Sequence, residues 1–253
     1  MGQLLKVVQA SVWLLLWGAL AVQSTTAQGT RYPPDDEAWD GTTYRALVER
    51  VETGGLALPT LSNAATKPVF ERMVNTDNIP LRMGLNRQLS VTIRFQRLDS
   101  ALAPIHKLVA LYANEAKNGK SYGKELARLM VYETKVAAAL LELSEPYLAT
   151  LAEQQRYQVH VAYLDQVKNG ARQLYADLVQ GMTETRLYSR SDIIEMIDGA
   201  HAAMAAHDPL LTAEDRRALV QKLTQQVAVT TDQGLKAALT ELRDAIQHRR
   251  LRT

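Results

Sequence analysis

The chain of 253 residues contains no cysteine. This absence excludes a disulfide scaffold, a thiol nucleophile, an iron–sulfur cluster and any zinc site with cysteine ligands. Phenylalanine occurs only twice, and Trp39 is the one tryptophan outside the first 27 residues. We therefore expect leucine, alanine and valine to fill most of a hydrophobic core, for which the hydrophobic content of 47% is sufficient.

Further absences narrow the class of protein. No segment of useful length alternates polar and apolar residues in the manner of a β-strand. The formal net charge is only +2, so there is no electrostatic case for binding nucleic acid. The chain also lacks a Gly-x-Ser-x-Gly elbow, a glycine-rich phosphate loop and a His-Glu-x-x-His motif. These absences remove the common sequence signatures of hydrolases, nucleotide-binding proteins and metalloproteases.

The one strongly apolar run lies near the N-terminus. Lys6 precedes the apolar segment 12–22, and small residues at 24–27 follow it. This order predicts a secretory signal peptide, residues 1–27, cleaved after Ala27. The apolar segment is about half of the ~20 residues that a membrane-spanning helix needs, although an uncleaved anchor stays open as an alternative. With no cysteine and no Asn-x-Ser/Thr signal, the pattern favours a periplasmic or secreted bacterial protein over a eukaryotic one.

Residues 28–84 are expected to form a flexible lead followed by short helices. Asp40 can cap a helix whose apolar face is Tyr44, Leu47, Val48 and Val51, and Gly54 can end it by adopting a left-handed backbone. A second short helix is expected over residues 68–74. The remainder, residues 85–253, should form the main helical domain.

The strongest periodicity in the chain begins at Val91. Apolar residues recur at alternating spacings of four and three, which is typical of a long helix packing lengthwise on others, as in a coiled coil. Pro104 should kink this helix, and Asn118 should end it. The stripe consists of Val91, Phe95, Leu98, Leu102, Ile105, Val109, Tyr112 and Ala116.

Similar stripes predict further helices from about Tyr122 and over 157–178. The first of these either kinks or breaks at Pro146, and the second has a possible interruption at Asn169-Gly170. Ser189-x-x-Asp192 and Thr212-x-x-Asp215 have the form of capping boxes at two later helix starts. The last helix should run to about residue 249, with a bend near Gly234.

These patterns predict an all-α fold, either an antiparallel helical bundle or a stack of helical hairpins, with a less regular N-terminal segment. The motif Tyr-x-x-x-x-Lys-Asn-Gly occurs at 112–119 and again at 163–170. Duplicated hairpins would produce this repetition, but little else aligns at that offset, which favours coincidence.

Two polar residues, Glu133 and His160, lie on otherwise apolar stripes. If their helices are antiparallel neighbours, the carboxylate and the imidazole could meet inside the bundle and perform acid–base chemistry. The simpler interpretation is that they fix the register of the helices or face solvent.

Asp198 and His201 are a candidate metal pair, because residues three apart share a helical face. His207 lies six residues beyond His201 and points elsewhere on an ideal helix. A ferritin-like di-metal site needs two Glu-x-x-His pairs and further carboxylates, and no partner motif is present. We expect no cofactor.

The sequence therefore predicts an exported helical protein, a non-enzymatic binding or scaffolding module of a bacterial envelope. It would engage a protein partner, or a second copy of itself, through its apolar stripes. The alternatives are a metal-binding protein or an acid–base enzyme with histidine and carboxylate inside the bundle, and a bundle with a tyrosine-lined ligand cavity.

Overall fold

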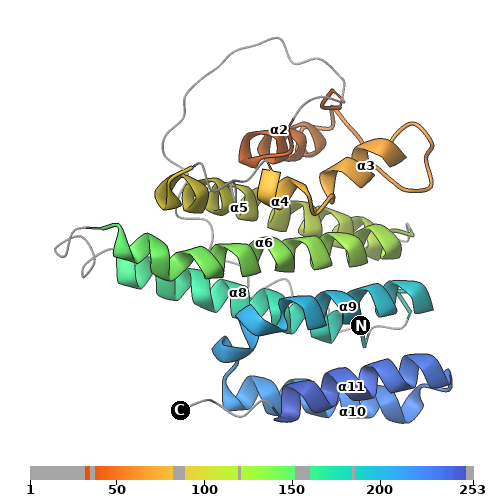
Figure 1. The fold of residues 1–253 in the computed structure, drawn as a ribbon. Helices are drawn as coiled ribbons and strands as arrows, with labels where there is room; N and C mark the ends of the chain where they lie inside the picture. Colours follow the sequence, from red (N-terminus) through yellow and green to blue (C-terminus); the bar gives the residue numbers. More distant parts are fainter. Residues whose placement is uncertain are drawn as a thin grey trace.

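A computed structural model describes residues 32–34, 38–81, 89–118, 121–151, 160–183 and 186–248. The predicted signal peptide and part of the predicted lead lie outside the described residues. Within the described ranges the chain forms nine α-helices, one short 3-10 helix and no strand (Figure 1). The helices are α2 (Gly41–Glu52), α3 (Lys67–Met73), α4 (Asn78–Leu81), α5 (Val91–Lys117), α6 (Gly123–Ala149), α8 (Val161–Gly181), α9 (Arg190–His207), α10 (Ala213–Val229) and α11 (Gln233–His248), with the 3-10 helix η3 at Asp208–Leu210.

The helices are stacked in layers. Helices α2 to α4 lie at one end, α5 and α6 follow, α8 and α9 come next, and α10 and α11 form the other end (Figure 1). Helix α6 packs against α5, α8 and α9, while α10 and α11 pack on each other and on α8 and α9. The pairs α5–α6 and α10–α11 are hairpins joined by short connections. The predicted all-α fold is confirmed. None of the described helices is long and apolar enough to cross a membrane.

Side-chain caps set most of the helix starts that the sequence predicts. The Asp40 carboxylate accepts hydrogen bonds from the N–H groups of Thr42 and Thr43. Both predicted capping boxes are present, since the Ser189 and Thr212 hydroxyls accept from the backbone of their partner aspartates and those aspartates accept in return. These bonds satisfy N–H groups that have no partner within the helix.

Two long helices continue through positions where the sequence left a break open as an alternative. Helix α6 continues through Pro146 to Ala149, so Pro146 does not break it. Glu142, whose carbonyl would otherwise accept from residue 146, is exposed and so is Pro146, which lets water hydrate the freed carbonyl. Helix α8 runs without a break through Asn169 and Gly170. Asn118 by contrast is the C-cap of α5. The first copy of the Lys-Asn-Gly motif therefore lies at the end of a helix, whereas the second lies inside one.

The prediction of a single final helix was wrong. Helix α10 ends at Val229, and α11 begins at Gln233. Thr230 leaves the helical conformation with ψ of 122°, and the Asp232 carboxylate accepts from the N–H of Leu235 at 2.8 Å. Asp232 therefore caps a new helix. Its side chain accepts a backbone hydrogen bond as Ser189 and Thr212 do, but Leu235, three residues later, has no polar side chain that could complete a capping box.

The apolar stripe of α5 also differs from the predicted heptad. Leu102 and Val109 are only half-buried, whereas Ala101 and Leu108 are fully buried. The reason is that α5 packs against α2 as well as α6, so its buried surface is wider than the narrow line of a two-helix coiled coil.

Gly199 allows α9 to approach α6 closely. A Cβ atom at this position would lie 2.6 and 2.7 Å from the two γ-carbons of Val131, a buried and β-branched side chain that has little room to move. Gly170, in contrast, sits in the middle of α8 with no atom within 4 Å of such a Cβ.

We expect Gly199→Ala to lower the free energy of unfolding by about 1–3 kcal/mol, because it overpacks the contact between α6 and α9. Gly170→Ala is the matched control and should raise it by about 0.5–1 kcal/mol, since alanine is the better helix former. Urea unfolding of both variants measures the difference. Equal effects of the two substitutions would contradict the close contact.

Candidate functional site

The structure pairs Glu133 with a different histidine from the one that the sequence suggested. Glu133 of α6 is 3% exposed, and its Oε1 lies 2.8 Å from Nδ1 of His106 on α5. His160 precedes α8, and its ring meets that of Tyr147 edge-on at 5.9 Å. Tyr147 and Glu133 are fourteen residues apart on α6, or about 21 Å along the helix axis. The structure therefore does not bring Glu133 and His160 together.

His160 instead borders a cluster of aromatic rings. Tyr147 stacks on Phe95 with ring centroids 4.2 Å apart and planes nearly parallel, and Tyr163 meets Phe95 edge-on. The Tyr163 hydroxyl donates to Asp99 of α5. Burial raises the pKa of Asp99, although the bond from Tyr163 opposes that effect. The cluster joins α5, α6 and α8, which is a packing role.

His106 was missed because of where it lies on α5. It directly follows Ile105, a member of the predicted stripe, and so is not itself a position of that stripe. In the structure the flank of that stripe faces α6, so the His106 side chain is only 22% exposed. A signal was present, since His106 and Lys107 are the only polar residues in the segment 101–111.

The surroundings of His106 favour its protonated form. Burial lowers the pKa of His106, but the charge and the hydrogen bond of Glu133, together with the charge of Asp177, outweigh burial and raise the pKa above its ordinary value of 6.5. His106 and Glu133 thus form an ion pair whose attraction weakens as the pH rises through the raised pKa of the histidine.

Asp177 of α8 is the third ionisable group of this site. Its Oδ1 accepts a hydrogen bond of 2.8 Å from Nε2 of Gln173, one turn earlier on the helix. Burial raises the pKa of Asp177 to about 6, and the charge of Glu133 adds to that effect. His106 and Lys222 of α10 act in the opposite direction.

His106, Glu133 and Asp177 therefore form a titrating cluster that spans three helices. The Asp177 carboxyl, with a pKa of about 6, changes charge just below neutral pH, and the raised pKa of His106 moves the change in charge of the imidazole to higher pH. Such a cluster can accept and release protons, which is the requirement for acid–base chemistry.

The other predicted pair, Asp198 and His201, lies one turn apart on α9. Asp198 is exposed and His201 is half-buried. Across the described ranges, no three histidine or carboxylate side chains converge in a way that could hold a metal ion. A third ligand for Asp198 and His201 is thus lacking in this part of the chain.

His207, at the end of the same helix, is fully buried. Its Nδ1 lies 3.0 Å from the carbonyl of Ala203, and its ring stacks on Tyr175 at 5.3 Å. Burial lowers the pKa of His207, while the bond to Ala203 opposes this. The histidine is thus held neutral in the core, where it packs beside α8.

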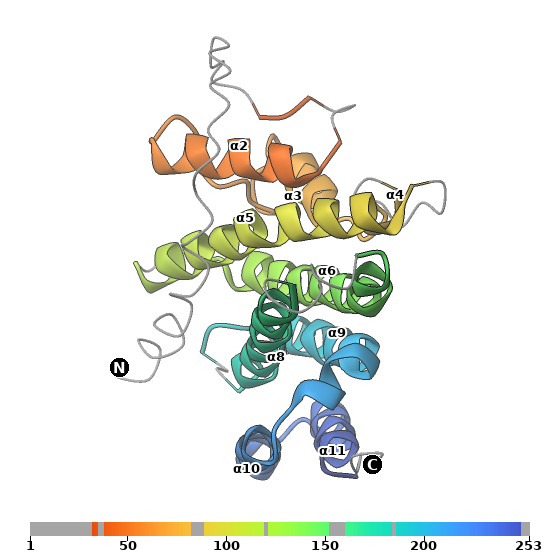
Figure 2. The same cartoon turned by 90° about the vertical axis from the view of Figure 1, so that its left-hand side faces the viewer.

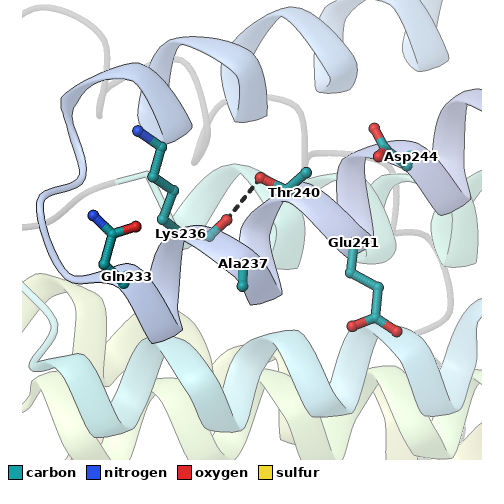
Figure 3. Close-up of a pocket in the computed structure, with 6 residues that line it drawn as sticks. All are labelled: Gln233, Lys236, Ala237, Thr240, Glu241 and Asp244. Carbon is teal, nitrogen blue, oxygen red and sulfur yellow. Dashed lines mark hydrogen bonds between the residues drawn. The ribbon is translucent and has the colours of Figure 1, made fainter.

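A hollow on the described surface runs along one face of α11 (Figure 3). It has a volume of about 520 Å³, and all six side chains that line it come from this one helix. The Thr240 hydroxyl is bonded to the carbonyl of Lys236 at 2.7 Å, and Asp244 pairs with Arg243. Because no second element contributes a side chain, the hollow does not gather groups around a ligand. Its lining consists of Gln233, Lys236, Ala237, Thr240, Glu241 and Asp244.

The raised pKa of Asp177 has a consequence for stability. The pKa of this carboxyl is near 3.8 in the unfolded chain and near 6 in the folded protein. Ionised Asp177 therefore lowers the free energy of unfolding progressively as the pH rises from about 4 to 6, and the full loss persists at higher pH. Asp177→Asn should therefore stabilise the protein by about 1 kcal/mol at pH 7.5, and the gain should disappear as the pH falls toward 4.

The measurement is urea unfolding of the parent and the variant at several pH values. Asp165→Asn, at an exposed position of the same helix, is the matched control for the loss of a carboxylate from α8. If both variants give the same stability difference at every pH, the cluster does not impose the expected cost on Asp177.

Comparison with known proteins gives no relative from which a function could be transferred. No family model matches the chain, and no curated protein and no solved structure matches it either. Only the chain's own residues therefore bear on its function.

Proposed function

We propose that the protein is exported and acts as a non-enzymatic helical module that binds or scaffolds a protein partner in a bacterial envelope. Export is supported by the order of features in residues 1–27, a positive start, an apolar segment and small residues before the expected cleavage after Ala27. The binding role is supported by how the described helices use their polar groups.

The observation that carries the binding role is that interior polar groups hold the layers to one another. The buried Glu125 carboxylate accepts from the N–H of Leu61 at 2.7 Å, and the Tyr112 hydroxyl donates to the carbonyl of Pro59 at 2.5 Å. In the last layer the Arg216 guanidinium donates to the carbonyl of Asp208 at 2.5 Å and also to its carboxylate. Groups committed to the fold in this way are not available to a substrate.

The shape of the stack agrees with a binding role. Figure 2 shows α2, α5, α6 and α9 one below another, with α10 and α11 at the end, so that the sides of several helices form a long lateral surface. The large apolar residues exposed on the described helices, Ile93, Val161 and Val229, lie on three different helices. A partner would therefore meet no group of large exposed apolar residues on these helices, which agrees with a non-obligate interface, because such interfaces are no more apolar than the rest of a protein surface.

The absence of natural cysteine permits a direct test in the cell. A single cysteine at an exposed position, Gln96→Cys on α5, Ala202→Cys on α9 or Ala237→Cys on α11, carries a photo-crosslinker at one known place. We expect uncrosslinked protein in the envelope fraction with the mass of residues 28–253. We also expect one defined adduct from the position that faces the partner and none from the others.

The result would separate the two parts of the proposal. Protein of full length in the cytoplasm would contradict export, whereas full-length protein in the membrane would mean that the leader is kept as an anchor. Exported protein that gives no adduct from any position, or the same mixture of adducts from all three, would contradict a specific binding role.

A second candidate function is acid–base catalysis by His106, Glu133 and Asp177. The observation that favours it is the short contact between His106 and Glu133 beside a carboxyl whose pKa is raised to about 6. His106 retains some solvent exposure, so a substrate proton could reach it.

If this candidate is right, the mature protein hydrolyses a member of a panel of ester, peptide and glycan substrates. Glu133→Gln should then reduce the rate at least 100-fold, while Glu142→Gln, at an exposed position of the same helix, should leave it unchanged. Circular dichroism verifies that both variants fold. Turnover that survives in Glu133→Gln would exclude the cluster as the catalyst.

A further inference from the structure

A second hollow, of about 310 Å³, lies where the turn after α3 meets α6 and α9. Unlike the hollow along α11, it is lined by side chains from several elements. Arg128, Val131, Tyr132 and Lys135 of α6 are spaced three and four residues apart and therefore share one face of the helix. The volume is at the lower end of the range for small-molecule sites in proteins.

The floor of this groove is apolar and firmly held. Tyr132 is 1% exposed, and its hydroxyl lies 2.9 Å from that of Tyr44. Tyr44 in turn donates to the carbonyl of Met73, so the bonds join α6, α2 and the end of α3. Val74 and Val131 lie beside Tyr132 in the lining. A ligand would meet a preformed surface, which reduces the entropy lost on binding.

One cation of the lining has no ion-pair partner among the described residues, although the lining carries two acidic and two basic side chains. Nε of Arg128 lies 3.3 Å from the Glu195 carboxylate, and Glu71 lies 3.8 Å from Lys67. Lys135 is half-buried and has no acidic partner anywhere in the described part of the chain. A half-buried ammonium group that lacks a partner is favourable only if water or an anion reaches it.

Further hydrogen-bond donors are available at the rim. Thr76, in the turn between α3 and α4, uses neither its N–H nor its hydroxyl in a hydrogen bond to any described residue. Arg128 is bonded to Glu195 through Nε, which leaves its two terminal nitrogens for another acceptor. The groove thus combines unused donors and a lysine that is unpaired within the described residues with an apolar floor.

We propose that this groove binds a small organic carboxylate with an apolar body. The carboxylate is held by Lys135, with Thr76 and Arg128 as further donors, and the apolar body lies over Val131 and Tyr132. This inference does not rest on the protein-binding role proposed above, and none of the residues that line the groove belongs to the titrating cluster.

The experiment is calorimetric titration of the mature protein with benzoate, phenylacetate and hexanoate, each compared with its neutral amide. We expect the carboxylates to bind at least tenfold more tightly than the amides, because only the charged group can pair with Lys135. We also compare a tripeptide that has a free C-terminus with the same tripeptide amidated at its C-terminus. Tighter binding of the free tripeptide than of the small acids would identify a peptide end as the source of the carboxylate.

Lys135→Met removes the charge but keeps an apolar side chain of similar length, and it should weaken carboxylate binding about tenfold or more. Lys124→Met is the matched control, because Lys124 is exposed on the same helix outside the groove, and it should leave binding unchanged. Val74→Phe, which fills part of the groove, should weaken binding of acids and amides alike. Circular dichroism confirms that each variant folds.

Three outcomes would overturn the inference. Carboxylates that bind no more tightly than their amides would show that charge recognition is absent. Equal affinities of the Lys135→Met and Lys124→Met variants would place the binding elsewhere, and no binding of any probe by the parent protein would show that the groove is not a carboxylate site.

Discussion

Helix α6 is buried on nearly all its sides, and the rest of the structure depends on this burial. It packs against α5, α8 and α9, and its buried positions include Leu126, Leu129, Val136, Leu140 and Leu143. A helix surrounded in this way contributes apolar area to every neighbouring layer, at about 25 cal/mol for each Å² removed from water. The same burial imposes a condition, because each polar group that α6 carries into the interior must find a partner there.

Three polar side chains of α6 meet this condition by bonding to different layers. Tyr132 is bonded to Tyr44 of α2, Glu133 to His106 of α5, and Arg128 to Glu195 of α9. Apolar packing alone tolerates small shifts between helices, whereas a hydrogen bond is lost when its donor and acceptor separate by an ångström or so. These bonds therefore fix the positions of the layers along α6.

The ionisable groups of the interior divide into two kinds by what surrounds them. His207 meets a backbone carbonyl and an aromatic ring, so burial dominates and its pKa falls. His106 meets Glu133 and Asp177, so charge outweighs burial and its pKa rises. The second environment connects the protonation of the protein to the packing of α5, α6 and α8, because the groups that share the protons come from all three helices.

Local signals explain where sequence reasoning was right and where it was wrong. The caps at Asp40, Ser189 and Thr212 act within three residues, so the sequence alone contains the donor, the acceptor and their spacing. Asp232 is a cap of the same kind, but the apolar periodicity continues on both sides of it and suggested one helix where there are two. Pro146 could not be interpreted from the sequence, since its effect depends on whether the freed carbonyl reaches water.

The sequence by itself determined that the chain is helical, where most helices start, and that no disulfide can hold it together, because these properties depend on neighbouring residues and composition. Only the tertiary structure decided that Glu133 meets His106 and not His160, and that Asp177 joins them. These partners are 27 and 44 residues from Glu133 along the chain, and the way in which the layers pack sets their distance in space. Periodicity indicates which face of a helix is buried, but it does not indicate which other helix covers that face.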